Sequence, residues 1–151
     1  MPAAIEEEVW RAGQGITLQG LVDGGRPRVL RGLCRDWPIV QLARQSDEAF
    51  AHYLARHDKG APVDVLRIPP GEDGVVGYNA ELTGFNYKHF RVSVTEVLQR
   101  LVHYSGLDDP PGLAMQSAVL STFLPSFAPL HPNPLLHCDR PETGARDPSK
   151  S

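Results

Sequence analysis

The chain has few cysteines and no long apolar run. Among its 151 residues only Cys34 and Cys138 are cysteines, too few for a disulfide framework or for a zinc site built on paired cysteines. No apolar stretch approaches the ~20 residues needed to span a bilayer, and no basic region followed by an apolar segment indicates a signal peptide. These absences predict a cytoplasmic protein in a reducing setting, without a membrane partner.

Charge shows no strong bias either. The formal net charge is -3, and lysine and arginine form no block, so we expect no nucleic-acid partner. The one like-charge run, Glu6–Glu8, is typical of a solvated surface. There is no G-x-S-x-G turn for a nucleophile and no phosphate-binding loop. Gly13-Gln14-Gly15 does not begin a dinucleotide loop, because Leu18 stands where the third glycine would be.

Residues 26–40 carry the strongest local pattern. Val29 and Leu30 predict a short buried strand, and the residues after Arg31-Gly32 predict a corner. Asp36 is the expected N-cap of a following helix, with Pro38 close to the first-turn position that tolerates a missing N–H.

Two further helices are predicted by their N-terminal residues. Ser46 should cap a helix that has Asp47 and Glu48 in its first turn, where negative charge is favourable. Ser93 and Glu96 form the capping box S-x-x-E. The residues after Ser93 have the apolar spacing of a buried helical stripe, with members Val94, Val97, Leu98, Leu101 and Val102.

Strands are expected between these helices. Val63–Ile68 and Val75–Asn79 are predicted to pair as a hairpin around the turn that includes Gly71 and Gly74. Leu113–Leu120 is predicted as a strand with a single polar residue, Gln116. One interpretation of Gln116 is a buried amide whose hydrogen bonds go to neighbouring backbone.

Two phrases and the Gln116 strand resemble a known family. RPRVLRGLCRDWP and YNAELTGFNYKHF are similar to the N-terminal part of the cupin-like, JmjC-related oxygenases, over about residues 20–136. The resemblance implies an α+β fold, with the N-terminal cap helices and first strands of a double-stranded β-helix whose barrel is incomplete. It assigns residues 1–136 to this domain, and we expect residues 137–151 to be a disordered tail outside the family.

The resemblance also implies a cofactor set. Full-length relatives hold Fe(II) with two histidines and one carboxylate, leaving positions open for 2-oxoglutarate and O₂. Gln116 is the one cofactor-binding candidate, because the family has a glutamine at this point of the wall around the co-substrate. The tyrosine that family members often carry two residues earlier is replaced by Ala114. We expect no cofactor in this chain itself.

One H-x-D sequence, His137-Cys138-Asp139, is a candidate metal site. Alternate residues of a strand point to the same side, so His137 and Asp139 would face one metal. Against this, the surrounding segment is rich in proline and charge, and no histidine follows to complete a triad. His131 lies six positions before His137, with two prolines between them, which leaves its geometry as a third ligand arbitrary. No metal site is therefore expected.

These observations lead to one functional prediction and one alternative. The chain is predicted to be a truncated N-terminal portion of an Fe(II)- and 2-oxoglutarate-dependent oxygenase or hydroxylase, and to be catalytically inactive as given. The alternative is a free-standing, non-catalytic binding or dimerisation module that shares the cap. In either case an incomplete barrel leaves strand edges through which copies can associate.

Overall fold

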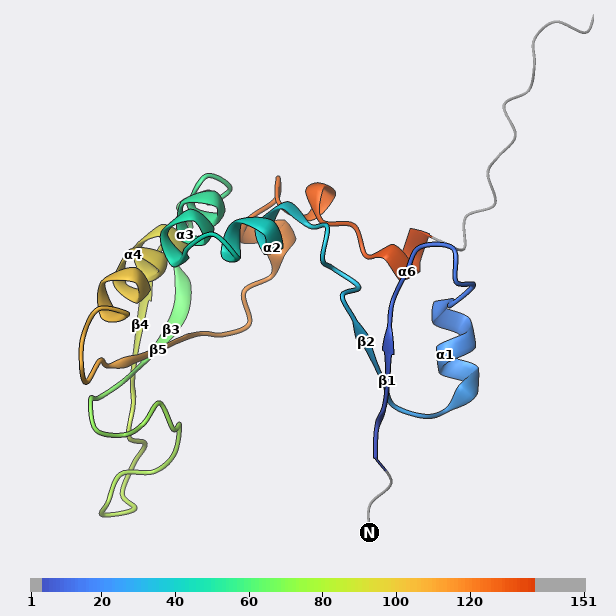
Figure 1. The fold of residues 1–151 in the computed structure, drawn as a ribbon. Helices are drawn as coiled ribbons and strands as arrows, with labels where there is room; N and C mark the ends of the chain where they lie inside the picture. Colours follow the sequence, from blue (N-terminus) through green and yellow to red (C-terminus); the bar gives the residue numbers. More distant parts are fainter. Residues whose placement is uncertain (1–3, 138–151) are drawn as a thin grey trace, which may run out of the picture. The chain divides into compact units, whose positions relative to one another are not determined.

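The computed structural model describes residues 4–137, and the chain divides into two compact units (Figure 1). The first unit combines residues 4–36 with residues 132–137, and the second runs from Trp37 to His131. Helices alternate with strands of two small sheets, and the described residues form no closed barrel. The predicted mixture of helices and small sheets is confirmed at this level. None of the helices between residues 4 and 137 is long and apolar enough to cross a membrane.

The first unit is a small β-α-β arrangement. Strand β1 (Glu6–Val9) pairs in parallel with β2 (Arg28–Arg31), and helix α1 (Leu18–Gly24) lies between them in the chain. The hydroxyl of Thr17 accepts a hydrogen bond from the Gly20 N–H at 3.0 Å and so begins α1. A short helix, α6 (Pro134–His137), completes this unit.

Backbone pairing and ion pairs, rather than burial, connect the two strands of this unit. Arg28 pairs with Glu6 at 3.2 Å and with Glu8 at 3.6 Å, and Arg31 binds both carboxylate oxygens of Glu7 at 2.8 and 2.9 Å. The acidic run is therefore solvent-facing, as predicted, but it is also a strand. No residue between 4 and 36 is buried.

The second unit places helices against one face of an antiparallel sheet. The sheet has the order β4-β3-β5, with bounds Lys88–Val92, Val63–Ile68 and Gly112–Met115. The helices are α2 (Pro38–Ala43), α3 (Asp47–Ala55), α4 (Val94–Tyr104) and α5 (Leu120–Phe123), followed by a 3₁₀ turn, η1 (Ala128–Leu130). Helix α3 packs against both α2 and α4.

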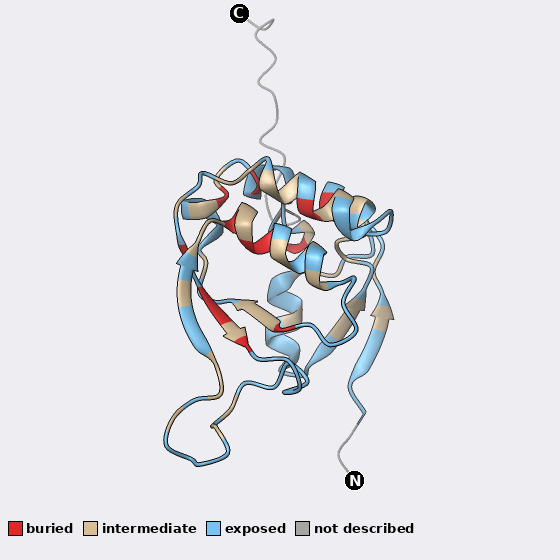
Figure 2. Cartoon of the chain, turned by 90° about the vertical axis from the view of Figure 1, so that its left-hand side faces the viewer, coloured by how far each residue is buried: buried red, intermediate tan, exposed pale blue. Residues whose placement is uncertain are grey.

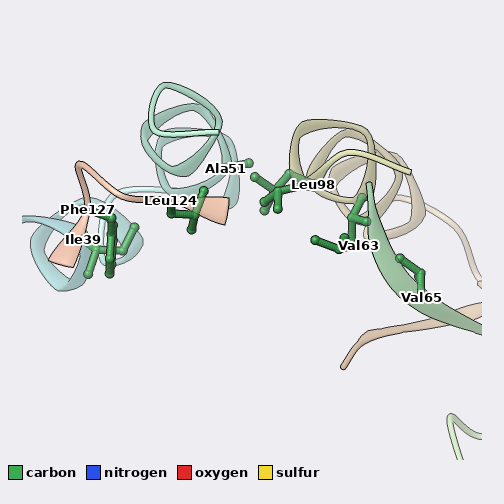
Figure 3. Packing of buried hydrophobic residues seen from close by; sticks show 9 residues of the cluster. Ile39, Ala51, Val63, Val65, Leu98, Leu124 and Phe127 are labelled. Atoms are coloured by element: carbon green, nitrogen blue, oxygen red, sulfur yellow. The ribbon is translucent and has the colours of Figure 1, made fainter. Parts of the chain in front are cut away.

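One hydrophobic core connects these elements. In Figure 3, Leu98 of α4 lies between Ala51 of α3 and Val63 of β3, while Ile39 and Phe127 pack together at the other end of the cluster. The buried residues are concentrated in β3 and the helices, whereas β1, β2 and α1 are pale blue or tan in Figure 2. Burial of this apolar face is the main stabilising contribution in the second unit.

Local sequence patterns placed the two larger helices correctly. The Ser46 hydroxyl accepts from the Ala49 N–H at 3.0 Å, and the Ser93 hydroxyl accepts from the Glu96 N–H at 3.2 Å. The Glu96 carboxylate does not return to the Ser93 backbone but pairs with Arg100 one turn later.

Three local predictions are corrected, the first at the start of α2. The N-cap of α2 is Trp37, one residue after the predicted Asp36, and its indole makes no capping hydrogen bond. The cap comes from far along the chain, because Nε2 of His131 accepts the Ile39 N–H at 3.3 Å. The free N–H of the first helical turn is thereby satisfied by a tertiary contact.

The second correction concerns the hairpin. Residues 75–79 form no strand, and β3 pairs with β4 across a long loop instead. Two asparagine side chains bind the backbone of this loop: Asn79 Oδ1 accepts from the Thr83 N–H at 3.0 Å and Asn86 Oδ1 accepts from the Gly77 N–H at 2.9 Å. Side chains therefore take up backbone groups that a β-ladder would otherwise use.

The third correction shortens the last strand. Strand β5 ends at Met115 rather than Leu120. Ser117 adopts a positive φ of 51°, which interrupts the extended backbone, and helix α5 begins at Leu120.

Candidate functional site

Gln116 directly follows β5. Its backbone N–H donates to the carbonyl oxygen of Asp64 at 3.2 Å, which fixes its position against β3. Its side chain is exposed, so the interpretation as a buried amide is wrong. Ala114 lies opposite Leu66 in the register and shares a face with Gln116, because residues two apart in a strand point the same way.

Gln116 belongs to the sheet face that lies away from the core. Val63 and Val65 of β3 belong to the core cluster, so the residues that alternate with them face the other side. We call this side the outer face. Its members by strand register are Asp64, Leu66, Ile68, His89, Arg91, Ala114 and Gln116.

The outer face is polar at one end and apolar at its centre. Nε of Arg91 lies 3.2 Å from Oδ1 of Asp64, and the Arg91 guanidinium also donates to the Pro62 carbonyl at 3.1 Å. Both charged side chains are more than 60% exposed, with values of 62% and 64%, so the pair stabilises the fold weakly. Leu66 and Ile68 are each only 2% exposed.

The described residues do not fit an iron centre of the expected type. Such a centre needs two histidines and one carboxylate around the metal. The outer face provides His89 and Asp64 but no second histidine, and Asp64 is engaged by Arg91. Over the whole described part of the chain, no three His, Cys, Asp or Glu residues lie close enough to hold a metal ion.

The H-x-D sequence lies at the limit of the described residues. His137 is the last residue of α6, so its backbone is helical and not part of a strand. Asp139 lies outside the described residues.

His131 has a structural role that the sequence did not reveal. The residue is only 6% exposed, Nε2 accepts the Ile39 N–H, and Nδ1 lies 2.8 Å from the Phe127 carbonyl oxygen. Since Nε2 is the acceptor, Nδ1 carries the proton and donates to Phe127. Its ring stacks on Phe127 with centroids 3.8 Å apart. Both nitrogens are occupied, which leaves no lone pair for a metal in this arrangement.

Hollows in the structure lie elsewhere. A hollow of about 370 Å³ between α3 and α4 is lined by apolar residues, among them Ala51 and Leu98, and equally by polar ones: Glu48, His52, Thr95 and Gln99. In the first unit, a hollow of about 320 Å³ borders Thr17, Arg26 and Arg28. Arg28 is already paired with Glu6 and Glu8, and neither hollow brings together groups suited to redox or hydrolytic chemistry.

Comparison with protein families gives a match to the cupin-like domain over residues 16–144, most of the chain. The chain belongs to the cupin-like domain family. Searches of curated proteins and of solved structures gave no match. In this cupin-like chain, Gln116 and Ala114 lie on the outer face. No residue on it completes a metal site within the described part.

Proposed function

We propose that this chain is the N-terminal portion of an Fe(II)- and 2-oxoglutarate-dependent oxygenase of the cupin-like family, and that it is catalytically incomplete by itself. The proposal rests on one combination: a family match over residues 16–144, and a larger sheet that has three strands in the described part of the chain. A cytoplasmic, reducing setting, in which Cys34 stays a free thiol, is part of the proposal.

In the proposed enzyme, the outer face would border the co-substrate, and other strands would hold the metal. Gln116 would border the 2-oxoglutarate pocket, with Ala114 beside it on the outer face. Fe(II) would supply the oxygen chemistry, and its ligands would come from barrel strands other than β3, β4 and β5. Ala114 stands where family members often have a tyrosine and provides no phenol group. The outer face would therefore make fewer contacts with the co-substrate.

Ligand-induced stabilisation tests the proposal directly. The purified chain is melted anaerobically with saturating Fe(II), with 2-oxoglutarate, and with both. A ligand bound only by the native state must raise the melting temperature, and we expect no rise. A rise that disappears in the His137→Ala, Asp139→Ala double variant would mean that this chain builds an iron site of its own.

Genomic sequence provides a second test. Reading the DNA downstream of the codon for Ser151 in all three frames should reveal a strand with H-x-D and a later histidine. Failure to find them would favour the alternative, a free-standing binding or dimerisation module. The specific observation in favour of that alternative is the set of exposed apolar side chains at and after β5: Met115, Val119 and Leu120.

A further inference from the structure

The strands at the borders of the two sheets differ in charge. Among the described residues, β4 and β5 each pair only with β3, so each leaves one edge open. Strand β4 carries Lys88 and Arg91, and β1 in the first unit carries three glutamates. Like charges on an edge oppose pairing with a second copy of the same strand. Strand β5, with the sequence GLAM, carries no charge at all.

The register identifies the backbone groups at the open edge of β5. Gln116 donates to Asp64 across the ladder, so Ala114 and Gly112, two and four residues earlier, are also hydrogen-bonded to β3. In an antiparallel ladder the residues between them direct their N–H and C=O groups away from the partner strand. Leu113 and Met115 therefore present two donors and two acceptors at the open edge.

This pattern is self-complementary. Consider β5 beside a second β5 in antiparallel orientation, with Ala114 opposite Ala114. Leu113 of each copy then lies opposite Met115 of the other. Each such pair exchanges both backbone hydrogen bonds. Leu113 and Met115 lie on the same sheet face, so apolar side chains meet across the join, and Met115 is 40% exposed in the single chain.

We infer that two copies of this chain associate through β5, about a twofold axis, into a continuous six-stranded sheet of order β4-β3-β5-β5′-β3′-β4′. A twofold contact requires one surface that complements itself, and β5 meets this requirement without like-charge repulsion. Met115 is the residue of β5 whose side chain gains most burial. The inference does not depend on the proposed enzymatic function, because it involves no iron ligand and no co-substrate.

Sedimentation equilibrium of the full chain tests the inference. We expect a monomer–dimer equilibrium, weakened about 10- to 100-fold by Met115→Lys, because each lysine must be buried opposite Leu113 of the other copy. The matched control is His103→Lys, which adds the same charge on the exposed side of α4 and should leave the dimer unchanged. Circular dichroism and urea unfolding establish that both variants are folded.

Amide hydrogen exchange gives a readout that needs no variant. Protection of the Leu113 and Met115 amides should increase with protein concentration, while the Ala114 and Gln116 amides, bound to β3, stay protected throughout. A chain that remains monomeric overturns the inference. A dimer that is insensitive to Met115→Lys, or one that protects β4 amides instead, also overturns it.

Discussion

In the second unit, Val63, Val65 and Val94 are at most 1% exposed and belong to one core that connects helices to a sheet, whereas in the first unit no residue from 4 to 36 is buried. The strands of the first unit are instead joined by backbone hydrogen bonds and by ion pairs of Arg28 and Arg31. Burial of apolar area contributes far more free energy than exposed ion pairs do. The second unit should therefore set the global unfolding free energy.

The largest effect is expected from a cavity in that core. Leu98→Ala removes a side chain that is 6% exposed and packs between α3 and β3, and should lower the free energy of unfolding by about 2–4 kcal/mol. Urea unfolding followed by circular dichroism measures it. Leu101→Ala on the same helix is the control: its side chain is 41% exposed, and the loss should be clearly smaller. Equal losses would contradict a burial-based account of this unit.

A buried polar contact should have the next largest effect. His131→Ala leaves the Ile39 N–H without its acceptor and removes the ring stacked on Phe127, which should cost about 1–3 kcal/mol of unfolding free energy. His103→Ala removes an exposed histidine and should change stability little. If the two variants were equally stable, the helix α2 cap would not depend on His131.

A partly exposed cap should follow in size. The Asp58 carboxylate accepts from the N–H and hydroxyl of Thr95 at 2.8 and 2.7 Å and from the Gly60 N–H at 2.8 Å. Thr95 lies in the first turn of α4, so Asp58→Ala should lower the unfolding free energy by about 1–2 kcal/mol at neutral pH.

The same carboxylate predicts an acid dependence. Burial tends to raise the pKa of Asp58, but the hydrogen bonds from Thr95 and Gly60 outweigh it and hold this pKa below the ordinary value of 3.8. A group with a lowered pKa in the folded state binds fewer protons there than in the unfolded chain. Its stabilising contribution is therefore complete above pH ~5 and is lost as the pH falls through the folded-state pKa. Unfolding free energies from pH 7 to pH 3 should fall more steeply in the native chain than in Asp58→Ala.

The smallest effect is expected in the first unit. Arg31→Gln removes the guanidinium whose hydrogen bonds and charge lower the pKa of Glu7, so this pKa should rise toward its ordinary value in an NMR titration. The free energy of global unfolding should be unchanged. Added salt should reduce the difference in the Glu7 pKa between the native chain and Arg31→Gln. Arg28→Gln is the control, since Arg28 pairs with Glu6 and Glu8 and not with Glu7. A large drop in global stability would show that the first unit contributes more than its exposure suggests.

Much of the second unit could be predicted from short stretches of sequence. The serines at the starts of α3 and α4 cap these helices through contacts within one or two turns. The apolar run of β3 follows a single strand. The prediction for the residues after β3 was wrong, because Val75–Asn79 has the apolar pattern of a strand. Asparagine side chains bind this loop, and such contacts are invisible to a pattern of apolar residues. For the candidate site, the sequence indicated Gln116 but not the exposure of its side chain.

The sequence by itself indicated the family, through two stretches that resemble its members. It also determined the principal helices and strand β3, because capping and hydrophobic periodicity depend on residues a few positions apart. Only the tertiary structure decided that the acidic run pairs in parallel with β2, that β4 is the partner of β3, and that His131 caps α2 across 92 residues of chain. Each of these contacts requires distant segments to be brought together at a cost in chain entropy. That cost is offset by the packing of the whole unit and not by any local pattern.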